Sequence, residues 1–565
     1  MNQRKPIPIG EEFYKKMIDD SYYYVDKTLL IRDLLAQKNK VTLFTRPRRF
    51  GKTLALSMLC AFFEQEILPD GTVADNSVYF QGKKIMAAGE EFTKHMGQYP
   101  VIFMTLKSAK QPNYEMAYEL LVREIIHEFE RHKYVLEGDA LSPLQKEHYL
   151  ALSENKAEPS LYAVALKFLS ECLEQYHQKK VVILIDEYDV PLENAYLRGF
   201  YREMTDFIRS LFESALKTNP CLAFAVITGC LRISKESIFT GLNNFKVFSL
   251  LDESYAEYFG FTQDEVDGML ANYGIPDKTD EMKEWYNGYL CGNTEIYNPW
   301  SAINYIYDIV YNNTKFPKPY WANTSSNSIV QELVVKADDN TRRELEQLVA
   351  GGTVKKPVHE EITYADIHKS QDNLWNFLFF TGYLKAVARR FEATAIWLDL
   401  KIPNMEILSI YHNTILEWFQ EKTNAVDFSN LYSAIQTGNT QAIESILKQQ
   451  LHDSISFLDS AENFYHGFLL GLLSGLRGYE KLSNRESGED RYDIVLKPYD
   501  EQQPAVILEL KRVQRFTEMD GMCKKALQQI EDKHYDAELL DEGYPVIMKY
   551  GICFCKKSCM VKMKK

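Results

Sequence analysis

The sequence predicts an α/β protein whose first part is a doubly wound parallel sheet. Over about the first 250 residues, short runs rich in β-branched residues alternate with longer amphipathic stretches, the pattern of repeated strand–helix units. Several runs are apolar at consecutive positions, as parallel strands covered by helices on both faces are. At 565 residues the chain is too long for one hydrophobic core, so further domains are expected.

The elements of this first part follow from the runs themselves. Five strands are expected, at 41–44, 101–106, 181–185, 222–227 and 247–251. Helices are expected between them, among others at 54–63, 161–176 and 200–216. Together these elements predict a domain over residues 1–260.

Two further regions are predicted after this domain. Short helices and aromatic clusters predict a helical middle region over 261–440, in which 362–407 fits helices and a β-hairpin in a winged-helix-like arrangement. A second α/β domain is predicted over 441–565. Its expected elements are a helix that ends at 476, strands at 492–496, 505–510 and 546–554, and a helix at 519–531.

Composition and charge narrow the class of protein. Hydrophobic residues make up 45% of the chain and charged residues 25%, which excludes disorder, collagen and coiled coil. The net charge is −14, so any contact with nucleic acid has to come from a local basic surface. The N-terminus lacks an apolar segment of signal-peptide length, and the longest apolar stretch, 468–476, is too short to cross a bilayer. Nine cysteines are expected as free thiols, and the sequence predicts a soluble cytoplasmic protein without a membrane partner.

A strand–loop–helix segment near the N-terminus predicts a phosphate-binding site. Strand 41–44 runs into Thr45-Arg-Pro-Arg-Arg-Phe-Gly-Lys-Thr53, and a helix follows at once. Backbone N–H groups of such a loop face an anion, its lysine reaches the terminal phosphates, and its threonine hydroxyl is a Mg²⁺ ligand. The expected nucleotide contacts are therefore Arg46, Arg49, Gly51, Lys52 and Thr53. Arg46 stands where the usual pattern has its first glycine, and it either changes the turn into the loop or brings a cation to the phosphates.

Two later strands supply the remaining groups of a nucleotide site. Strand 181–185 leads to Asp186 and Glu187; the first acid can hold Mg²⁺ through water, and the second can polarise an attacking water. The next strand leads to Thr228, placed to sense the terminal phosphate, and to Arg232, a source of positive charge. A turn threonine and a surface arginine are equally good interpretations of these last two residues. Together the segments predict an ATPase or an ATP-driven switch.

The C-terminal hairpin predicts a second metal centre. Glu509 and Lys511 are two apart on a strand and so share a face, and Asp493 on the partner strand can meet Glu509 across the pair. Two acids and a lysine on one face are costly in a core unless they hold a cation. Asp493 and Glu509 are therefore expected to bind Mg²⁺, and Lys511 to activate the water that attacks a phosphodiester. The alternative is an exposed strand with solvated charges.

The motifs together resemble a bacterial family that joins an AAA-ATPase-like domain to a C-terminal nuclease-like domain of the PD-(D/E)XK superfamily. The matching stretches lie at 24–28, 46–53, 184–189, 228–229, 242–244, 285–288, 297–300, 381–384, 402–404, 486–488, 491–493 and 509–511. The resemblance implies a P-loop ATPase core, a helical and winged-helix-like middle region and a restriction-endonuclease-like end. It implies that Lys52, Thr53, Asp186 and Glu187 bind and hydrolyse ATP, and that the arginine in place of the first glycine is normal for the family. By the same resemblance, Asp493, Glu509 and Lys511 would form the nuclease centre.

Three interpretations of function stay open. The first is an ATPase that regulates a Mg²⁺-dependent nuclease acting on DNA, with a homo-oligomer in which a neighbour's arginine completes the ATP site. The second is a signalling or scaffold NTPase switch whose inactive nuclease-like domain only binds nucleic acid or a protein partner, which the net charge of −14 favours. The third is a site that binds nucleotide without turnover because of Arg46.

Overall fold

The structure is a computed structural model that describes residues 4–232, 238–239, 245–312, 314, 316–321, 330, 338–359, 370–392, 395–423, 428–453, 462–473, 475–483, 493–500 and 502–564. The motif residues 242–244, 486–488, 491 and 492 lie outside the described part. The chain divides into two compact units. The first is Met1–Ser325 with Lys355–Ile407, and the second is Ser326–Val354 with Leu408–Lys565.

The first unit is built on a parallel sheet of five strands in the order β2-β3-β4-β1-β5, which confirms the predicted doubly wound fold. The strands are β1 (Val41–Thr45), β2 (Val101–Thr105), β3 (Val181–Asp186), β4 (Leu222–Gly229) and β5 (Phe245–Phe248). The last strand ends three residues before the predicted end. A turn stops it there, in which the Asp252 carboxylate accepts a hydrogen bond from Ser249 N at 2.8 Å.

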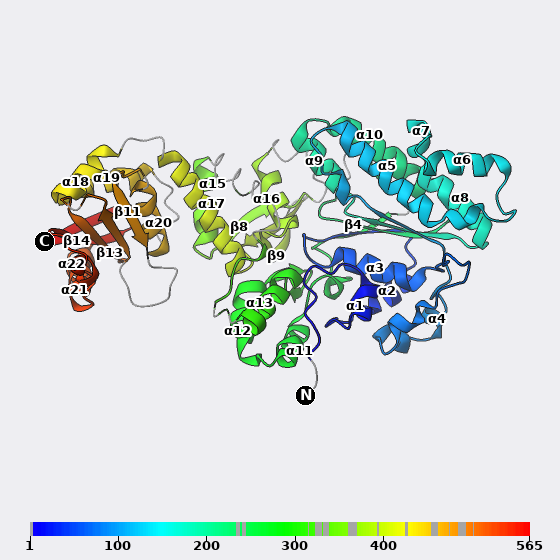
Figure 1. Ribbon diagram of the computed structural model, residues 1–565, viewed down its shortest axis with the longest axis horizontal. Coiled ribbons are helices and arrows are strands. Elements are labelled where there is room, and N and C mark those ends of the chain that lie inside the picture. The colour runs from blue at the N-terminus through cyan, green and yellow to red at the C-terminus, as the bar shows by residue number, and fades with distance from the viewer. Residues whose placement is uncertain are drawn as a thin grey trace. The chain divides into compact units, whose positions relative to one another are not determined.

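Helices cover both faces of this sheet, and Figure 1 shows the two layers. The first layer holds α1 (Tyr14–Asp19), α2 (Leu29–Gln37), α3 (Lys52–Phe63) and α4 (Glu90–Thr93). The second holds α5 (Tyr114–Arg131), α6 (Pro143–Ser153), α7 (Pro159–Tyr162), α8 (Ala165–His177), α9 (Val190–Arg198) and α10 (Tyr201–Phe212). The helix predicted at 161–176 is divided into α7 and α8, and the helix predicted at 200–216 continues past α10 as one wider turn, Glu213–Lys217.

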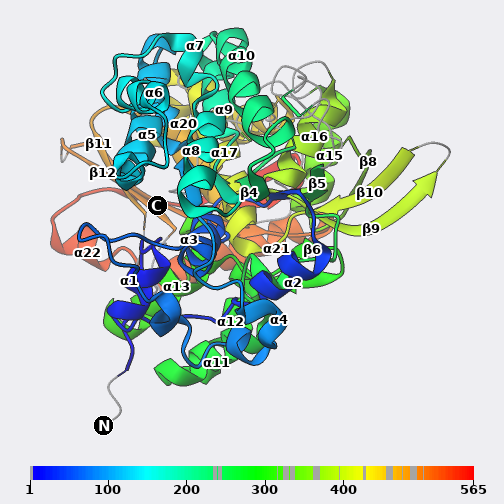
Figure 2. The ribbon, with the colours of Figure 1, turned by 90° about the vertical axis from the view of Figure 1, so that its right-hand side faces the viewer.

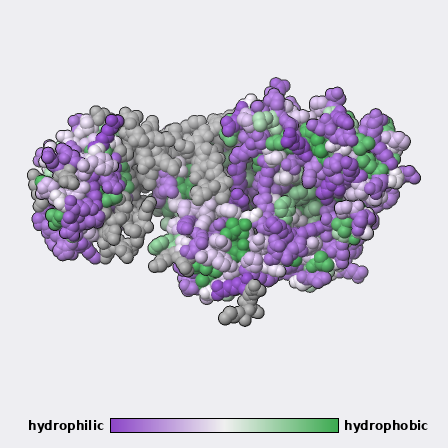
Figure 3. Space-filling view, in the orientation of Figure 1, coloured by the Kyte–Doolittle hydropathy of each residue, from purple (hydrophilic) through white to green (hydrophobic). Residues whose placement is uncertain are grey.

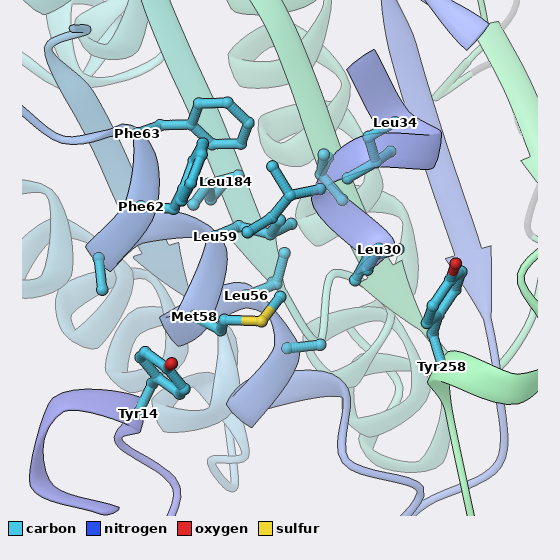
Figure 4. Packing of buried hydrophobic residues seen from close by; sticks show 14 of the residues in the cluster. Tyr14, Leu30, Leu34, Leu56, Met58, Leu59, Phe62, Phe63, Leu184 and Tyr258 are labelled. Carbon is cyan, nitrogen blue, oxygen red and sulfur yellow. The ribbon is translucent and has the colours of Figure 1, made fainter. Parts of the chain in front are cut away.

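Helix α3 is the element that fixes segment 45–53, which the sequence predicts to bind phosphate and which is called the phosphate loop below. Its apolar side chains, among them Leu56, Leu59 and Phe62, are buried against α1, α2 and the sheet, where Leu184 of β3 joins them (Figure 4). A helix that is apolar over most of its surface is buried on most of its surface. Because α3 begins at Lys52, this packing holds the helix N-terminus at the carboxyl edge of the sheet.

The middle of the chain contains helices and two small sheets. Its elements in the first unit are α11 (Gln263–Tyr273), α12 (Thr279–Tyr286), β6 (Tyr289–Cys291), β7 (Thr294–Ile296), α13 (Pro299–Asn312), α16 (Gln371–Phe380), β9 (Lys385–Glu392) and β10 (Ala395–Lys401). Strand β8 (Val354–Pro357) completes a sheet in the order β8-β10-β9, and Figure 2 shows β9 and β10 as a long hairpin. A helix followed by a hairpin is what the sequence predicts for 362–407, of which residues 362–369 and 393–394 lie outside the described part.

The second unit contains a mixed sheet in the order β11-β12-β13-β14-β15. Its strands are β11 (Tyr479–Ser483), β12 (Ile494–Pro498), β13 (Ala505–Arg512), β14 (Ile547–Cys555) and β15 (Ser558–Lys564), and its helices include α15 (Asp339–Val349), α18 (Ser429–Thr437), α19 (Thr440–Asp453), α20 (Glu462–Leu473), α21 (Met519–Asp532) and α22 (Ala537–Asp541). Helix α17 (Met405–Thr423) begins in the first unit and ends in the second. Strands β13 and β14 are parallel, and α21 connects them.

The end of the chain differs from the sequence-based interpretation. The last strand expected from the sequence is 546–554, but residues 558–564 form a further, edge strand antiparallel to β14. Cys559 and Val561 are buried in it, which explains why the segment pairs with the sheet instead of extending into water. On the face in Figure 3, most of the described surface is hydrophilic, with apolar residues scattered over it. Among the described residues no helix combines the length and apolar character that a bilayer span needs, and the nine cysteines are free thiols.

Candidate functional site

The phosphate loop and the ends of β3 and β4 meet at the carboxyl edge of the first sheet. Thr53 Oγ1 donates a hydrogen bond to Asp186 Oδ2 at 2.7 Å, and Thr228 Oγ1 donates to Asp186 Oδ1 at 2.6 Å. Asp186 and Thr228 are fully buried. The structure therefore brings together three predicted site residues that are far apart in sequence, because parallel strands present their carboxyl ends at one edge.

The loop itself is held by its backbone and by Lys52. Gly51, at the start of α3, has φ 80°, a conformation that favours glycine. Arg49 with φ 68° and Glu187 with φ 51° are non-glycine residues in the same left-handed region, and such conformations concentrate at functional sites. Lys52 Nζ donates to the carbonyl oxygens of Arg46 at 2.9 Å and Pro47 at 2.8 Å, so its ammonium lies across its own loop.

A cavity of about 530 Å³ lies beside the loop. Its polar wall includes Arg49, Gly51, Lys52, Thr53 and Glu187. Its apolar wall comes from the N-terminal segment, α11 and α13, and includes Tyr23, Tyr24, Phe261, Tyr273, Trp300 and Ile303. Aromatic residues before the first strand are more often core residues than ligand contacts, yet here two of them line the cavity. The cavity thus joins a phosphate loop to an apolar chamber large enough for a nucleoside.

Glu187 is the cavity acid best suited to accept a proton. Burial raises the pKa of its carboxyl group, while the nearby Lys52 ammonium opposes the shift and the Asp186 carboxylate adds to it. A carboxylate whose pKa is raised is a stronger base than an exposed glutamate.

Arg46 and Arg232 are not brought to this cavity. The Arg46 guanidinium is fully buried, donates to the carbonyl oxygens of Thr45 at 2.9 Å and Phe248 at 3.0 Å, and lies 5.5 Å from the centroid of the Phe259 ring. Of the two interpretations of Arg46, the changed turn fits this position and the phosphate contact does not. Arg232 is half-buried and is not among the residues that line the cavity.

The turn after β3 determines where the loop with Arg232 runs. Asp189 Oδ2 accepts hydrogen bonds from Cys230 N at 2.8 Å and Leu231 N at 3.0 Å, and the Tyr188 hydroxyl donates to Leu231 O at 2.6 Å. These bonds fasten the chain just after Thr228 to the chain just after Glu187.

The middle-region motifs gather around the outer side of the phosphate loop. Trp321 Nε1 donates to Arg48 O at 3.2 Å, and the Arg49 guanidinium lies 4.6 Å from the centroid of the Trp300 ring. A Cβ atom on Gly382 would come within 3.0 Å of Pro47, so the glycine lets the chain approach the loop closely. Sequence reasoning treats these stretches as turns with buried rings and does not predict that they cover the loop.

A buried acid, Glu406, holds in place the middle-region segments that contact the phosphate loop. The Glu406 carboxylate accepts hydrogen bonds from Ser301 Oγ at 2.8 Å and Trp321 N at 2.8 Å. Burial raises the pKa of Glu406 to about 7. No sequence pattern singles out this residue, because its partners lie 85 and 105 positions earlier in the chain.

The second candidate centre is on the hairpin of β12 and β13. Ile494 pairs with Leu508, a register that places Asp493 opposite Glu509, and Asp493 Oδ2 accepts a hydrogen bond from Leu510 N at 2.8 Å. Lys511 Nζ donates to Glu509 Oε1 at 2.8 Å. The structure thus brings together the three residues predicted from the sequence.

Glu509 is the unusual member of this group. It is 2% exposed, and its Oε2 atom is buried without a hydrogen-bond partner among the described residues. Burial raises the pKa of Glu509 to about 7, and the nearby Asp493 carboxylate adds to the shift. Two carboxylates, one with an orphaned buried oxygen, are a donor set that fits a hard divalent cation. Within the described ranges, however, no cluster of three or more His, Cys, Asp or Glu side chains is placed to hold a metal ion.

Polar residues on the helices before and after the hairpin make contacts of their own. The Glu462 side chain lies outside the described part. Gln529 Nε2 donates to the Tyr535 hydroxyl at 3.3 Å, so the two bond to each other. His466 of α20 contacts the Asp493 carbonyl oxygen through Nε2 at 2.9 Å and thereby supports the turn before β12, which sequence reasoning did not predict.

Two domain families match this chain. Residues 8–239 match the family described as predicted AAA-ATPase, and residues 460–564 match the PD-(D/E)XK nuclease superfamily. The chain therefore combines a segment similar to AAA-ATPase-like domains with a C-terminal segment similar to the PD-(D/E)XK nuclease superfamily. Both matches confirm the resemblance drawn from the motifs.

The chain is also similar to a curated relative and to solved structures. The chain is 28% identical over 357 residues to an uncharacterized protein in the vnfD 5′ region of Azotobacter chroococcum mcd 1, a match over 61% of this chain and 59% of the relative. This chain thus spans well under two thirds of that relative's length. A Walker-type ATPase of Pyrococcus abyssi aligns with a TM-score of 0.36 and 11% identity, over 72% of this chain and 99% of that one.

Proposed function

We propose that this protein binds and hydrolyses ATP, and that the nucleotide controls a Mg²⁺-dependent nuclease in the C-terminal domain that acts on DNA. The observation that carries the proposal is the pairing, in one chain, of a phosphate loop closed on Asp186 with a buried carboxylate–lysine group on β13. Assembly as a homo-oligomer is a further proposal, because such ATP sites are often completed by a neighbouring subunit.

In the nucleotide site, the predicted residues other than Arg46 and Arg232 have roles that their positions support. Thr53 and Asp186 would hold Mg²⁺, since both offer oxygen ligands at the helix N-terminus. Lys52 would exchange the carbonyls of Arg46 and Pro47 for phosphate oxygens. Bound Mg²⁺ would neutralise charge on the phosphates.

Glu187 would act in ATP hydrolysis, and Thr228 would sense whether the terminal phosphate is present. Glu187 would accept a proton from the attacking water, which its raised pKa favours. Thr228 would report on the terminal phosphate, because its hydroxyl shares Asp186 with Thr53. Arg49 and Gly51 line the polar wall and would contact phosphate through the guanidinium and the backbone N–H.

In the nuclease centre, Asp493 and Glu509 would hold Mg²⁺ through their carboxylate oxygens. A cation there would compensate the buried negative charge of Glu509 and would give its Oε2 atom, which accepts no hydrogen bond from the described residues, a partner. Bound Mg²⁺ would polarise the phosphodiester, and Lys511 would position the attacking water. The adjacent Leu508 and Leu510 are buried on the opposite face of β13 and anchor the strand that carries Glu509 and Lys511.

A second function is supported by a separate observation. The described part holds only two acids at the nuclease centre, and the net charge of the chain is −14, which works against a polyanionic substrate. The protein would then be an NTPase switch whose C-terminal domain binds nucleic acid or a protein partner without cutting it.

One experiment separates the two functions. Wild type, Lys52→Ala, Lys511→Ala and the control Lys524→Ala, which changes an exposed lysine paired with Asp520, are incubated with Mg²⁺ and with or without ATP. Linear, circular and single-stranded DNA are the substrates. Cleavage that is lost in Lys511→Ala and altered in Lys52→Ala supports the regulated nuclease. ATP hydrolysis without cleavage of any substrate supports the switch, and absence of both activities contradicts the proposal.

A further inference from the structure

A lysine outside the loop motifs lies at the same edge of the sheet. Strand β2 runs parallel to β3 with Thr105 opposite Asp186, and Leu106 N donates to Asp186 O at 3.0 Å. Lys107 follows immediately, in a short turn of 3-10 helix. Because β2 and β3 end together, Lys107 leaves the sheet beside the segment that carries Asp186 and Glu187.

Lys107 shares the nucleotide cavity with the loop. It lines that cavity together with Lys52, Thr53 and Glu187. Its Nζ donates to Glu12 Oε2 at 2.7 Å, and Glu12 also lines the cavity. The side chains are 36% and 40% exposed, and ion pairs with that exposure contribute little stability. The bond between Lys107 and Glu12 is therefore one that a more strongly charged ligand can replace.

The surrounding charges keep Lys107 cationic. Burial acts to lower the pKa of its ammonium, but the carboxylates of Glu12, Glu187 and Asp186 outweigh burial and raise it. The ammonium is thus a fixed positive charge at neutral pH, on the side of the cavity where Glu187 lies.

We propose that Lys107 binds the terminal phosphate of ATP from within the same chain, and that Glu12 is the carboxylate that it exchanges for this phosphate. The inference rests on the proposed ATP binding. The terminal phosphate is the one that Lys107 reaches, because Glu187, which would act on the water attacking that phosphate, is its neighbour in the cavity. At this position the chain itself then supplies a positive charge of the kind that the sequence analysis expects from a neighbouring subunit's arginine.

The test compares affinities for ATP and ADP, measured by calorimetry with Mg²⁺ in the full chain. Lys107→Gln is expected to weaken ATP binding by roughly tenfold or more and ADP binding by less than about threefold, since one charge-assisted hydrogen bond to the third phosphate is lost. Glu12→Gln is expected to tighten ATP binding by up to about fivefold, because it removes a competitor of modest strength. Lys133→Gln, in an exposed ion pair with Glu130, is the control and is expected to leave both affinities unchanged.

The double variant identifies how Glu12 acts. If Glu12 acts only through Lys107, adding Glu12→Gln to Lys107→Gln changes nothing further. Unchanged ADP binding shows that Lys107→Gln is folded. Equal weakening of ATP and ADP, or no weakening of ATP, overturns the inference while leaving ATP binding intact. If wild type binds neither nucleotide, the proposed function itself fails and this inference fails with it.

Discussion

Replacing Glu406 by glutamine is expected to abolish a loss of unfolding free energy that the first unit suffers as the pH rises. The carboxylate is buried under Ser301 and Trp321, and its pKa is raised from 4.5 to about 7. Between these two values the folded chain binds a proton that the unfolded chain has lost. Stability from this group is therefore present below pH 4.5 and falls as the pH rises toward 7. The difference between the two pKa values corresponds to about 3 kcal/mol of lost unfolding free energy at pH 8.

Glutamine fits the same position because it keeps the shape and most of the hydrogen bonds. Its carbonyl oxygen can accept from Trp321 N, and its amide can donate to the Ser301 hydroxyl, which accepts as well as donates. We expect Glu406→Gln and wild type to have similar stability at pH 5. At pH 8 the variant should be more stable by up to about 3 kcal/mol.

The assay is urea unfolding of the full chain at several pH values, followed by tryptophan fluorescence, because Trp321 bonds to the acid through its backbone N–H and Trp300 directly precedes Ser301. Glu147→Gln, on the exposed side of α6, is the matched control and should follow wild type at every pH. A difference between Glu406→Gln and wild type that stays constant from pH 5 to 8, or that favours wild type at pH 8, would show that the charged carboxylate is not destabilising.

Three further experiments test the packing of the second unit and the two candidate sites. Gly551→Ala would place a Cβ atom 2.5 Å from the Cys523 carbonyl oxygen of α21, so we expect its unfolding free energy to be about 1–3 kcal/mol lower in a urea titration. The control Gly521→Ala, whose Cβ atom meets nothing within 4 Å, should change the unfolding free energy little. The Glu509 carboxyl must lose its proton to bind a cation and its pKa is raised to about 7, so Mg²⁺ should raise the melting temperature of wild type more at pH 8 than at pH 6. An equal Mg²⁺ effect at both pH values, or its persistence in Glu509→Gln, would count against the metal centre. Glu187→Gln should keep ATP affinity within a few-fold and slow phosphate release by roughly a hundredfold, and undiminished release would remove Glu187 as the base.

The sequence was sufficient to predict the strands of the first sheet and the functional groups next to strand ends. Runs such as Val181–Asp186 are apolar at nearly every position, and only a buried parallel strand accommodates that pattern with helices on both sides. Asp186 and Glu509 could be placed because a strand's direction and alternation determine where its end and its faces lie. Strand β11, by contrast, is not among the predicted strands. It is an edge strand that pairs with β12 alone, and its run Tyr479–Ser483 mixes charged and apolar residues, so its sequence carries a weaker signal.

Contacts between distant segments could not be read from the sequence. Whether Arg46 points to a phosphate or into the protein depends on Phe248 and Phe259, which are about two hundred positions away and have no pattern in common with it. Lys107 belongs to no motif, and only the pairing of β2 with β3 places it beside Glu187. The sequence therefore predicts the groups that follow a strand, but not those that fold back over the loop.

The place of β1 in the strand order has a consequence for how the chain folds during synthesis. Strand β1 lies between β4 and β5, so Val41–Thr45 leaves the ribosome long before either partner strand has been synthesised. Closing so long a loop is slow, and in the meantime an apolar strand and the apolar helix α3 remain without their final partners. Nascent chains that stop before β4 should therefore aggregate or bind chaperones instead of forming a partial sheet. The cavity beside the phosphate loop forms later still, because Glu406, which accepts hydrogen bonds from Ser301 and Trp321, is synthesised after all of these segments.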